Sequence, residues 1–271
     1  MPASNEIYNA AADIWWADDQ PLSMIRTALN PVRLRYLKDV LRRSGVDPAG
    51  KTLADIGCGG GLFAEELARL GASVIGVDPS APSLVTARAH AQAAGLTIDY
   101  RLGSGEQLPL PDACADIACC VDVLEHVSDV PAVLRETARI LKPGGVYLYD
   151  TINRTPLSRL AVIWASQDWG LTAWAPPDLH HYSQFSTPAE LHSLLEASGL
   201  SDGGQAGIKP SAWPPRILWL LRQARTGKIS YAELGRRLEF ALAKDMRISY
   251  IGHAIKNPTA RGRSPGPHRG S

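Results

Sequence analysis

The stretch Thr52–Ser80, TLADIGCGGGLFAEELARLGASVIGVDPS, decides the fold. A short apolar run leads into a glycine turn, an amphipathic segment follows, and a second apolar run ends at Asp78. This order indicates strand, turn, helix and strand, the unit from which parallel α/β sheets are built. Ligands of such sheets bind where the strands end, so the turn and Asp78 mark a candidate binding edge.

The same alternation continues along the chain. Apolar runs that predict strands cover 51–58, 72–78, 97–103, 114–124, 146–153 and 245–256. Segments with helical spacing and end signals cover 30–44, 62–70, 82–94, 130–145 and 187–200. In the last of these, Thr187 is expected to cap the helix, with Pro188 in its first turn and Glu190 completing a capping box. The alternation predicts an α/β fold with a doubly wound, mostly parallel sheet.

The chain divides into five segments by composition. We expect a helical N-terminal cap over 1–50 and one main domain over 51–256. Within that domain, the tryptophan-rich segment 155–183 is interpreted as a lid and 214–244 as a helical insertion. The Pro, Gly and Arg composition of 257–271 predicts a disordered tail.

Composition limits the classes of function. Lys and Arg total 28 and Asp and Glu total 27, so a net charge of +1 gives no electrostatic case for nucleic acid. The four cysteines form no CxxC pair and no disulfide or zinc spacing, which indicates a reduced, cytoplasmic protein. No apolar run reaches the roughly 18 residues of a membrane span, and the first residues lack the pattern of a signal peptide.

The glycine turn excludes two common nucleotide sites. The third glycine of a dinucleotide fingerprint would fall on Leu62, and no Gly-Lys-Ser/Thr follows as a P-loop requires. A glycine turn and a helix N-terminus still favour an anion, which in S-adenosylmethionine (SAM) can be the methionine carboxylate. Asp78 lies where a carboxylate can accept hydrogen bonds from both ribose hydroxyls. Gly105 and Glu106 are expected beside the adenine.

Five segments together resemble class I SAM-dependent methyltransferases: LADIGCGGG, VIGVDPS, GSGEQLPLPD, DIACCVDVLEHV and ARILKPGG. The N-terminal DIWWADDQPLSMIRTALNPVRLRYL and the final SYIGHAIK are more specifically similar to the ubiquinone-biosynthesis O-methyltransferases. This resemblance runs from about Asn5 to Lys256. It implies a seven-stranded Rossmann-like sheet, SAM as the cofactor, and methylation of a hydroxyl on a polyprenyl catechol or demethylubiquinol.

The resemblance also assigns cofactor contacts. It implies that Arg33 holds the SAM carboxylate, that Gly57 lies under the methionine portion and that Asp78 binds the ribose. Val121 is expected to line the adenosyl pocket. The remaining residues of the expected cofactor site are Asp55, Gly59, Gly61, Gly105 and Glu106. A solvated arginine on an amphipathic helix is the alternative for Arg33.

An acidic cluster follows the fourth predicted strand, at Asp122, Glu125 and His126. In the family, a Glu-x-x-Glu-His version is associated with a divalent cation, and Mg²⁺ favours carboxylate oxygens. These three residues are therefore the expected metal ligands, although Asp122 is one methylene shorter than Glu. Local hydrogen bonding of Glu and His is the alternative, because the LEHV segment recurs where no metal binds.

Methyl transfer to a phenol needs a base or a metal that assists deprotonation, because a phenol has a pKa near 10. His126 is the first candidate for a catalytic base, followed by His181 and His180 in PDLHHYSQF. The family usually shows Gly-Thr-His in this loop, so the sequence departs here while keeping a histidine. A surface position in a loop is the alternative for each histidine.

The expected partner is a phenolic, prenylated small molecule. Because tryptophans suit a membrane interface, peripheral contact of the lid with the inner face of the membrane is a further hypothesis. The insertion 214–244 is longer than the family's C-terminal segment, and it could cover substrate, contact lipid or mediate dimerisation. An O-, N- or C-methyltransferase of secondary metabolism and a non-catalytic SAM-binding protein remain alternatives, and the sequence indicates no oligomeric state.

Overall fold

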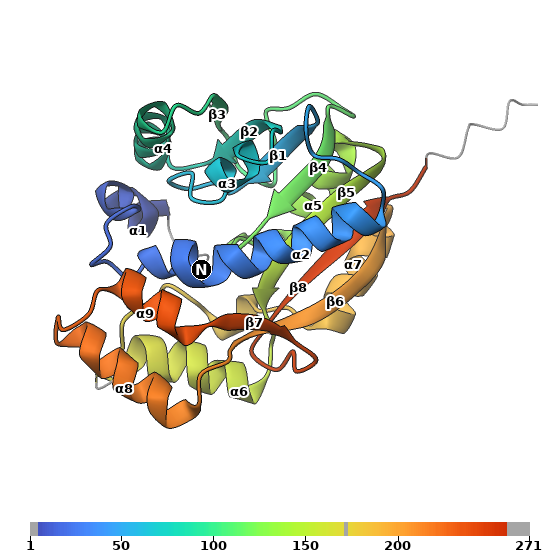
Figure 1. The fold of residues 1–271 in the computed structure, drawn as a ribbon. Helices are drawn as coiled ribbons and strands as arrows, with labels where there is room; N and C mark the ends of the chain where they lie inside the picture. The colour runs from blue at the N-terminus through green and yellow to red at the C-terminus, as the bar shows by residue number, and fades with distance from the viewer. Residues whose placement is uncertain (1–4, 171–172, 259–271) are drawn as a thin grey trace, which may run out of the picture.

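A computed structural model describes residues 5–170 and 173–258 of the chain, so most of the predicted disordered tail lies outside the described residues. Its sheet contains β1 (Thr52–Ile56), β2 (Ser73–Asp78), β3 (Ile98–Leu102), β4 (Ala115–Cys120), β5 (Leu141–Ile152), β6 (Leu200–Pro210), β7 (Phe240–Ala243) and β8 (Ser249–Lys256). The order across the sheet is β3-β2-β1-β4-β5-β8-β6-β7 (Figure 1).

The first five strands pair in parallel, and β8 pairs antiparallel with both β5 and β6. The doubly wound, mostly parallel α/β fold is thereby confirmed, with eight strands in the described residues in place of the expected seven. The chain crosses from β3 at one edge back to β4 beside β1. The glycine turn after β1 and the acidic loop after β4 therefore meet at this switch point, where ligands of such sheets bind.

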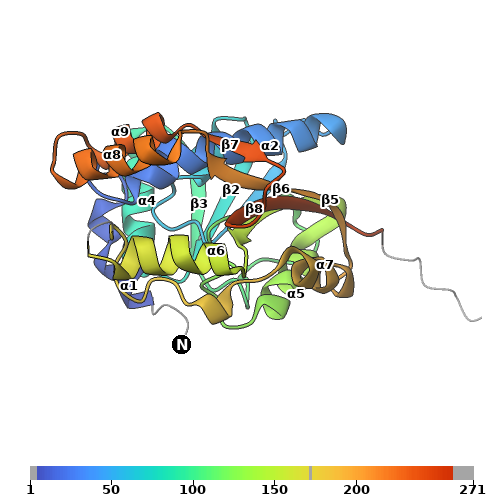
Figure 2. The ribbon, with the colours of Figure 1, turned by 90° about the horizontal axis from the view of Figure 1, so that it is seen from below.

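Helices cover both faces of the sheet. The chain forms α1 (Asn5–Ala10), η1 (Ala12–Ile14), η2 (Ile25–Leu29), α2 (Asn30–Arg43), α3 (Ala64–Ala68), α4 (Ala81–Ala93), α5 (Val130–Ile140), α6 (Pro156–Ser158), η3 (Arg159–Asp168), η4 (Tyr182–Gln184), α7 (Pro188–Ala197), α8 (Pro214–Arg225) and α9 (Tyr231–Leu238). Figure 2 shows α2 on one side of the sheet and α5 and α7 on the other.

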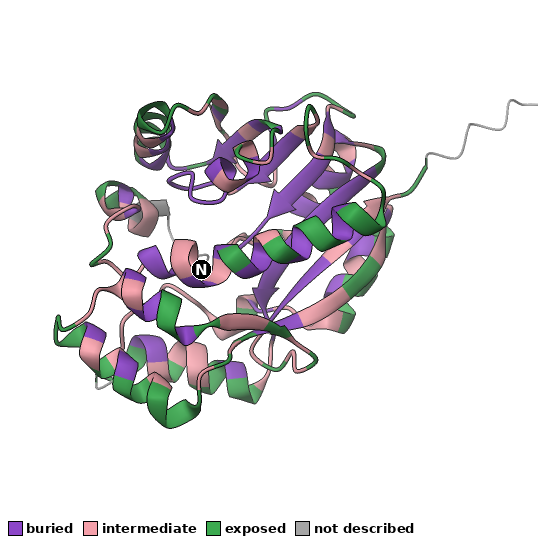
Figure 3. Cartoon of the chain, viewed as in Figure 1, coloured by how far each residue is buried: buried purple, intermediate pink, exposed green. Residues whose placement is uncertain are grey.

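The alternation of strand side chains explains the two layers. In β4, Ile117 and Cys119 join the core under α2 and α4, while Ala118 and Cys120 join the core under α5 and α7. The central strands are buried on both faces, as Figure 3 shows. The predicted capping box also forms, because Thr187 Oγ1 accepts the Glu190 N–H at 3.2 Å and Glu190 Oε2 accepts the Thr187 N–H at 2.9 Å.

Two strands have no counterpart in the sequence prediction. β6 (Leu200–Pro210) reads as polar and glycine-rich, and a register shift between Asp202 and Gly204 interrupts its pairing with β8. β7 lies inside the segment 214–244, which was expected to be helical and instead forms α8, α9 and this edge strand. Both strands are only partly buried, so they lack the apolar runs by which central strands are predicted.

Candidate active site

The turn after β1 leaves no room for side chains. Gly57, Gly59 and Gly61 have φ of +73°, +50° and +83°, a left-handed region that favours glycine. A Cβ on Gly59 would lie 2.7 Å from the Trp15 ring, and a Cβ on Gly57 would overlap Val123. The turn is therefore enclosed between the N-terminal segment and the loop after β4.

The carboxylate of Asp78 holds this turn from the neighbouring strand. Asp78 is the last residue of β2, and parallel pairing with β1 brings it level with the turn. Its Oδ2 accepts the Gly59 N–H at 2.8 Å, and its Oδ1 accepts the Ser80 N–H at 2.8 Å. Burial raises the pKa of Asp78, and these two N–H donors oppose that rise. Each oxygen retains a lone pair that a ribose hydroxyl can use.

Asp55 lies deeper, at the C-terminal end of β1. Its side chain is buried, and Oδ2 has no hydrogen-bond partner in residues 5–170 and 173–258. Burial, and then the charge of Asp78, raise the pKa of Asp55 to about 7. A half-protonated carboxyl here reduces the repulsion between the two acids at neutral pH. Asp55 therefore supports the turn and Asp78 from below.

Arg33, on α2, is only 1% exposed, and its guanidinium contacts other side chains of the protein. Its Nε lies 2.5 Å from Asp150 Oδ2, and its Nη2 lies 2.6 Å from Asp122 Oδ2. Nη1 donates to Asn30 Oδ1 at 3.1 Å, which leaves one Nη1 hydrogen without a partner in the described part of the chain. The guanidinium therefore neutralises two carboxylates, that of Asp122 just past the end of β4 and that of Asp150 near the end of β5.

The loop after β4 carries the predicted acidic cluster. Asp122 adopts a φ of +54°, and its N–H donates to Asp150 Oδ1 at 2.8 Å. Glu125 is buried, and its Oε2 accepts the Thr151 hydroxyl at 2.8 Å. Burial, followed by the charges of Asp122 and Asp150, raises the pKa of Glu125 to about 8. Glu125 is therefore mainly protonated at neutral pH.

Two of the three candidate histidines stand together beside this loop. The rings of His126 and His180 lie 5.0 Å apart, and His126 Nδ1 is buried without a hydrogen-bond partner among the described residues. His180 Nδ1 lies 2.8 Å from Gln167 Oε1 in η3. Burial lowers the pKa of His126 to about 3 and that of His180 to about 4. Both imidazoles are therefore neutral at pH 7, and each can accept a proton.

The other predicted site residues sit around the same edge. Val121 is buried and directly follows β4. Glu106, in the loop after β3, accepts the Ser128 N–H at 3.2 Å and so reaches the loop after β4. Gly105 lies against Val133 of α5. His181 precedes η4 and is half-buried, and its charge contributes to the lowered pKa of both His126 and His180.

The N-terminal segment covers this edge, a role that the sequence reasoning missed. Trp15 Nε1 donates to Ser83 Oγ at 3.0 Å, and Trp16 Nε1 donates to the Gly60 carbonyl at 2.9 Å. Tyr8 stacks on Trp15 at 6.1 Å and meets the His126 ring edge-on at 5.7 Å. The Trp15-Trp16 pair was a family signal, but only the structure shows that it closes over the glycine turn.

The predicted metal ligands are not arranged around an ion. Among the described residues, no group of three or more His, Cys, Asp or Glu side chains is placed to hold a metal. Asp122 instead binds Arg33, and the largely protonated Glu125 binds Thr151. A neutral carboxyl is a poor ligand for Mg²⁺, so the residues do not fit the ion as they stand.

Known proteins share this fold. Residues 54–149 match the methyltransferase domain family. A SAM-dependent methyltransferase from Thermotoga maritima superposes with a TM-score of 0.60 and 20% identity, over 93% of this chain and 98% of that chain. Another from Aquifex aeolicus gives 0.56 and 14%, over 94% and 99%. The two structures show the fold alone, and the matched domain defines the class of this protein as a methyltransferase.

Closer relatives identify the family. Several relatives share the description ubiquinone biosynthesis O-methyltransferase. The protein from Xanthomonas axonopodis pv. citri is 41% identical over 212 residues, 77% of this chain and 84% of its own length. That from Rhizobium etli strain CIAT 652 is 35% identical over 237 residues, 85% and 93% respectively. The chain belongs to this family and is a SAM-dependent O-methyltransferase, which confirms the resemblance seen in the sequence.

The titration of Asp55 gives a stability test. The folded pKa of about 7 lies above the unfolded value of about 3.9, so the wild type loses stability as the pH rises between them. Asp55→Asn cannot ionise, so its free energy of unfolding lacks this pH dependence. Between the two pKa values, the free energy of unfolding of the wild type should therefore fall relative to that of the variant, by up to about 1.4 kcal/mol per pH unit. Urea unfolding at about pH 5 and about pH 8 measures this difference, with the exposed Asp47→Asn as the control. A pH-independent difference would contradict a buried, protonated Asp55.

Proposed function

We propose that the enzyme methylates a phenolic oxygen of a prenylated catechol, a precursor of a quinone. The names of its relatives supply the substrate class. The observation that carries the proposal is the neutral His126–His180 pair beside the acidic loop, at the edge where Asp78 holds the glycine turn. Proton acceptors and a cofactor site thus share the C-terminal edge of the sheet.

The cofactor side rests on Asp78 and Arg33. When bound, SAM supplies a methyl group that its sulfonium already activates. We propose that Asp78 accepts the ribose hydroxyls while keeping its bonds to Gly59 and Ser80, and that the remaining Nη1 hydrogen of Arg33 faces the carboxylate. Asp55, Gly57, Gly61 and Val121 shape the floor of this site. The protein's contribution is positioning for in-line transfer.

The acceptor side rests on His126, with His180 and His181 as further candidates. A neutral imidazole can accept the phenolic proton as the oxygen gains its methyl group. The charge of Asp122 raises the pKa of both His126 and His180 against the effect of burial, so it stabilises an imidazolium once that forms. His126 is preferred because its Nδ1 has no partner in the described part of the chain.

The proposed reaction does not use the Mg²⁺ suggested by the family motif, because Asp122 and Glu125 bind Arg33 and Thr151 instead.

No helix in the described residues is both long and apolar enough to cross a bilayer. We further propose a cytoplasmic protein whose lid touches the inner face of the membrane. Trp164 and Trp169, which stack at 4.7 Å and are both exposed, support that contact.

Methyl transfer from labelled SAM to a soluble short-chain prenyl catechol tests the proposed reaction. We expect label in a phenolic ether, an unchanged rate after exhaustive chelation, and a loss of about 10²- to 10⁴-fold in kcat for His126→Asn. His192→Asn, on the exposed face of α7, is the control. SAM binding without label in any phenol would contradict O-methylation and favour a non-catalytic or other methyl acceptor role. A rate that falls on chelation and returns with Mg²⁺ would show that the acidic loop rearranges around an ion.

The role of Arg33 is tested with SAM and with 5′-methylthioadenosine, which has a neutral thioether in place of the sulfonium and lacks the whole amino-acid chain. SAM carries a carboxylate, whereas 5′-methylthioadenosine lacks it. If Arg33 holds this carboxylate, Arg33→Met should weaken SAM binding by about 1.5–3 kcal/mol more than methylthioadenosine binding. Calorimetry of both ligands measures the difference, and general damage from the unpaired Asp150 weakens both alike. Equal losses of binding free energy for the two ligands would show that Arg33 acts only on the acidic loop and does not hold the carboxylate.

A further inference from the structure

The exposed tryptophans of the described residues all lie on two helical segments. Trp164 and Trp169 belong to η3 and its end, while Trp213 and Trp219 belong to α8 and the residue before it. Exposed leucines accompany them, namely Leu157, Leu160 and Leu218. Single exposed apolar residues need no explanation, but a concentration of large ones marks an interaction surface.

Both segments leave the sheet at the same edge. β5 and β6 each pair antiparallel with β8, so they run in the same direction. α6 begins shortly after the end of β5, and α8 begins shortly after the end of β6. Figure 1 shows both helices at the lower end of the molecule, and Figure 2, seen from below, shows them as two separate ridges. The ridges thus stand at the C-terminal edge that carries the site.

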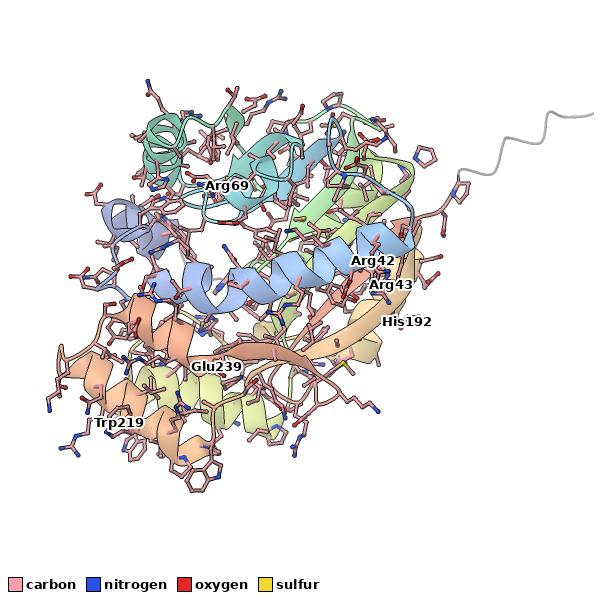
Figure 4. The ribbon with its side chains drawn as sticks, viewed as in Figure 1. Arg42, Arg43, Arg69, His192, Trp219 and Glu239 are labelled. Carbon is pink, nitrogen blue, oxygen red and sulfur yellow. The ribbon has the colours of Figure 1, made fainter. Side chains whose placement is uncertain are left out.

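α8 is held from one side only. Leu220 and Ala224 are buried against Leu234 and Leu238 of α9, together with Met24. At 100° per residue, Leu218 and Arg222 point away from that contact. Trp213, Leu218 and Trp219 remain 72%, 57% and 54% exposed, and Figure 4 shows Trp219 directed away from the protein.

This outer face is also basic. Arg216, Arg222, Arg225 and Lys228 are exposed, and the sequence has no Asp or Glu from residue 210 to residue 232. None of the four forms an ion pair within the part of the chain that the structure describes. On α9, by contrast, Arg236 and Arg237 both pair with Glu233. The charge is local, because the whole chain has a net charge of only +1.

We propose that this face, defined as Trp213, Leu218, Trp219 and the four cations around them, docks on an anionic lipid bilayer. Tryptophan rings favour the interface between headgroups and acyl chains, and a helix with such a face lies in the membrane plane. Basic side chains near an anionic surface each add about 1 kcal/mol. With the η3 tryptophans on the second ridge, docking turns the C-terminal edge of the sheet toward the lipid. The inference rests on exposure and charge, and not on the methyl acceptor.

Flotation of the full chain with lipid vesicles tests the proposal. We expect binding to phosphatidylcholine vesicles that contain phosphatidylglycerol, little binding to phosphatidylcholine alone, and weaker binding as salt rises. Arg222→Glu with Arg225→Glu should weaken binding about tenfold or more. The matched control is Arg42→Glu with Arg43→Glu. Both residues lie at the C-terminal end of α2, and Figure 4 shows them far from Trp219. Leu218→Ala with Trp219→Ala should also weaken binding, whereas Val85→Ala with Leu102→Ala, at exposed positions elsewhere, should not.

Equal flotation of the α8 and α2 charge variants would overturn the proposal, as would no flotation of the wild type. A dimer that Leu218→Ala with Trp219→Ala disrupts, in the absence of vesicle binding, would assign the face to a second copy and overturn it as well. Flotation needs no turnover, so failure of the methylation assay leaves this result intact. Methyl transfer to the soluble catechol should persist in the α8 variants, which separates lipid docking from catalysis.

Discussion

The carboxylate of Asp78 connects the two halves of the cofactor edge. It accepts an N–H from the glycine turn at Gly59 and another from Ser80, where α4 is capped. The turn can approach a ligand only because its glycines adopt positive φ, and this carboxylate fixes them there. Asp55 lies beneath with a raised pKa, which limits the negative charge that the fold must bury. The glycine turn and the start of α4 thus share one buried acid, the one proposed to bind the ribose.

Arg33 is the second buried charge on which the site depends, because it connects α2 to the acidic loop after β4, which lies far away in the sequence. Its guanidinium neutralises Asp150 and Asp122 at once, and the Asp122 N–H closes the network on Asp150. Glu125 keeps its proton and His126 stays neutral in these surroundings, because burial disfavours a further charge on either group. Neutral His126 therefore has a ring nitrogen that carries no proton, and Tyr8, which stacks on Trp15, packs edge-on against its ring.

Local signals in the sequence predicted the parts of the fold that local physics determines. The glycine turn, Asp78 at a strand end and the Thr187 capping box follow from short-range rules, and all appear in the structure. β6 was missed because it is polar and half-exposed. The Arg33–Asp150 pair joins residues 117 positions apart, and the stacking of Tyr8 on Trp15 against His126 depends on the whole fold. No spacing within one segment can indicate such contacts, so Arg33 and His126 were predicted as site residues, whereas Asp150 and Tyr8 were not.

The proposed contact between Asp78 and the ribose of SAM is the most direct point to test. Calorimetric titration of SAM into the wild type and Asp78→Asn measures this, with Asp99→Asn on the exposed face of β3 as the control. Asparagine keeps one acceptor for the two N–H donors of Gly59 and Ser80 and loses the charge, so SAM affinity should fall by about 1–3 kcal/mol in the variant protein that folds. Wild-type affinity in a folded Asp78→Asn protein would show that the ribose binds elsewhere and would contradict the assignment of this edge.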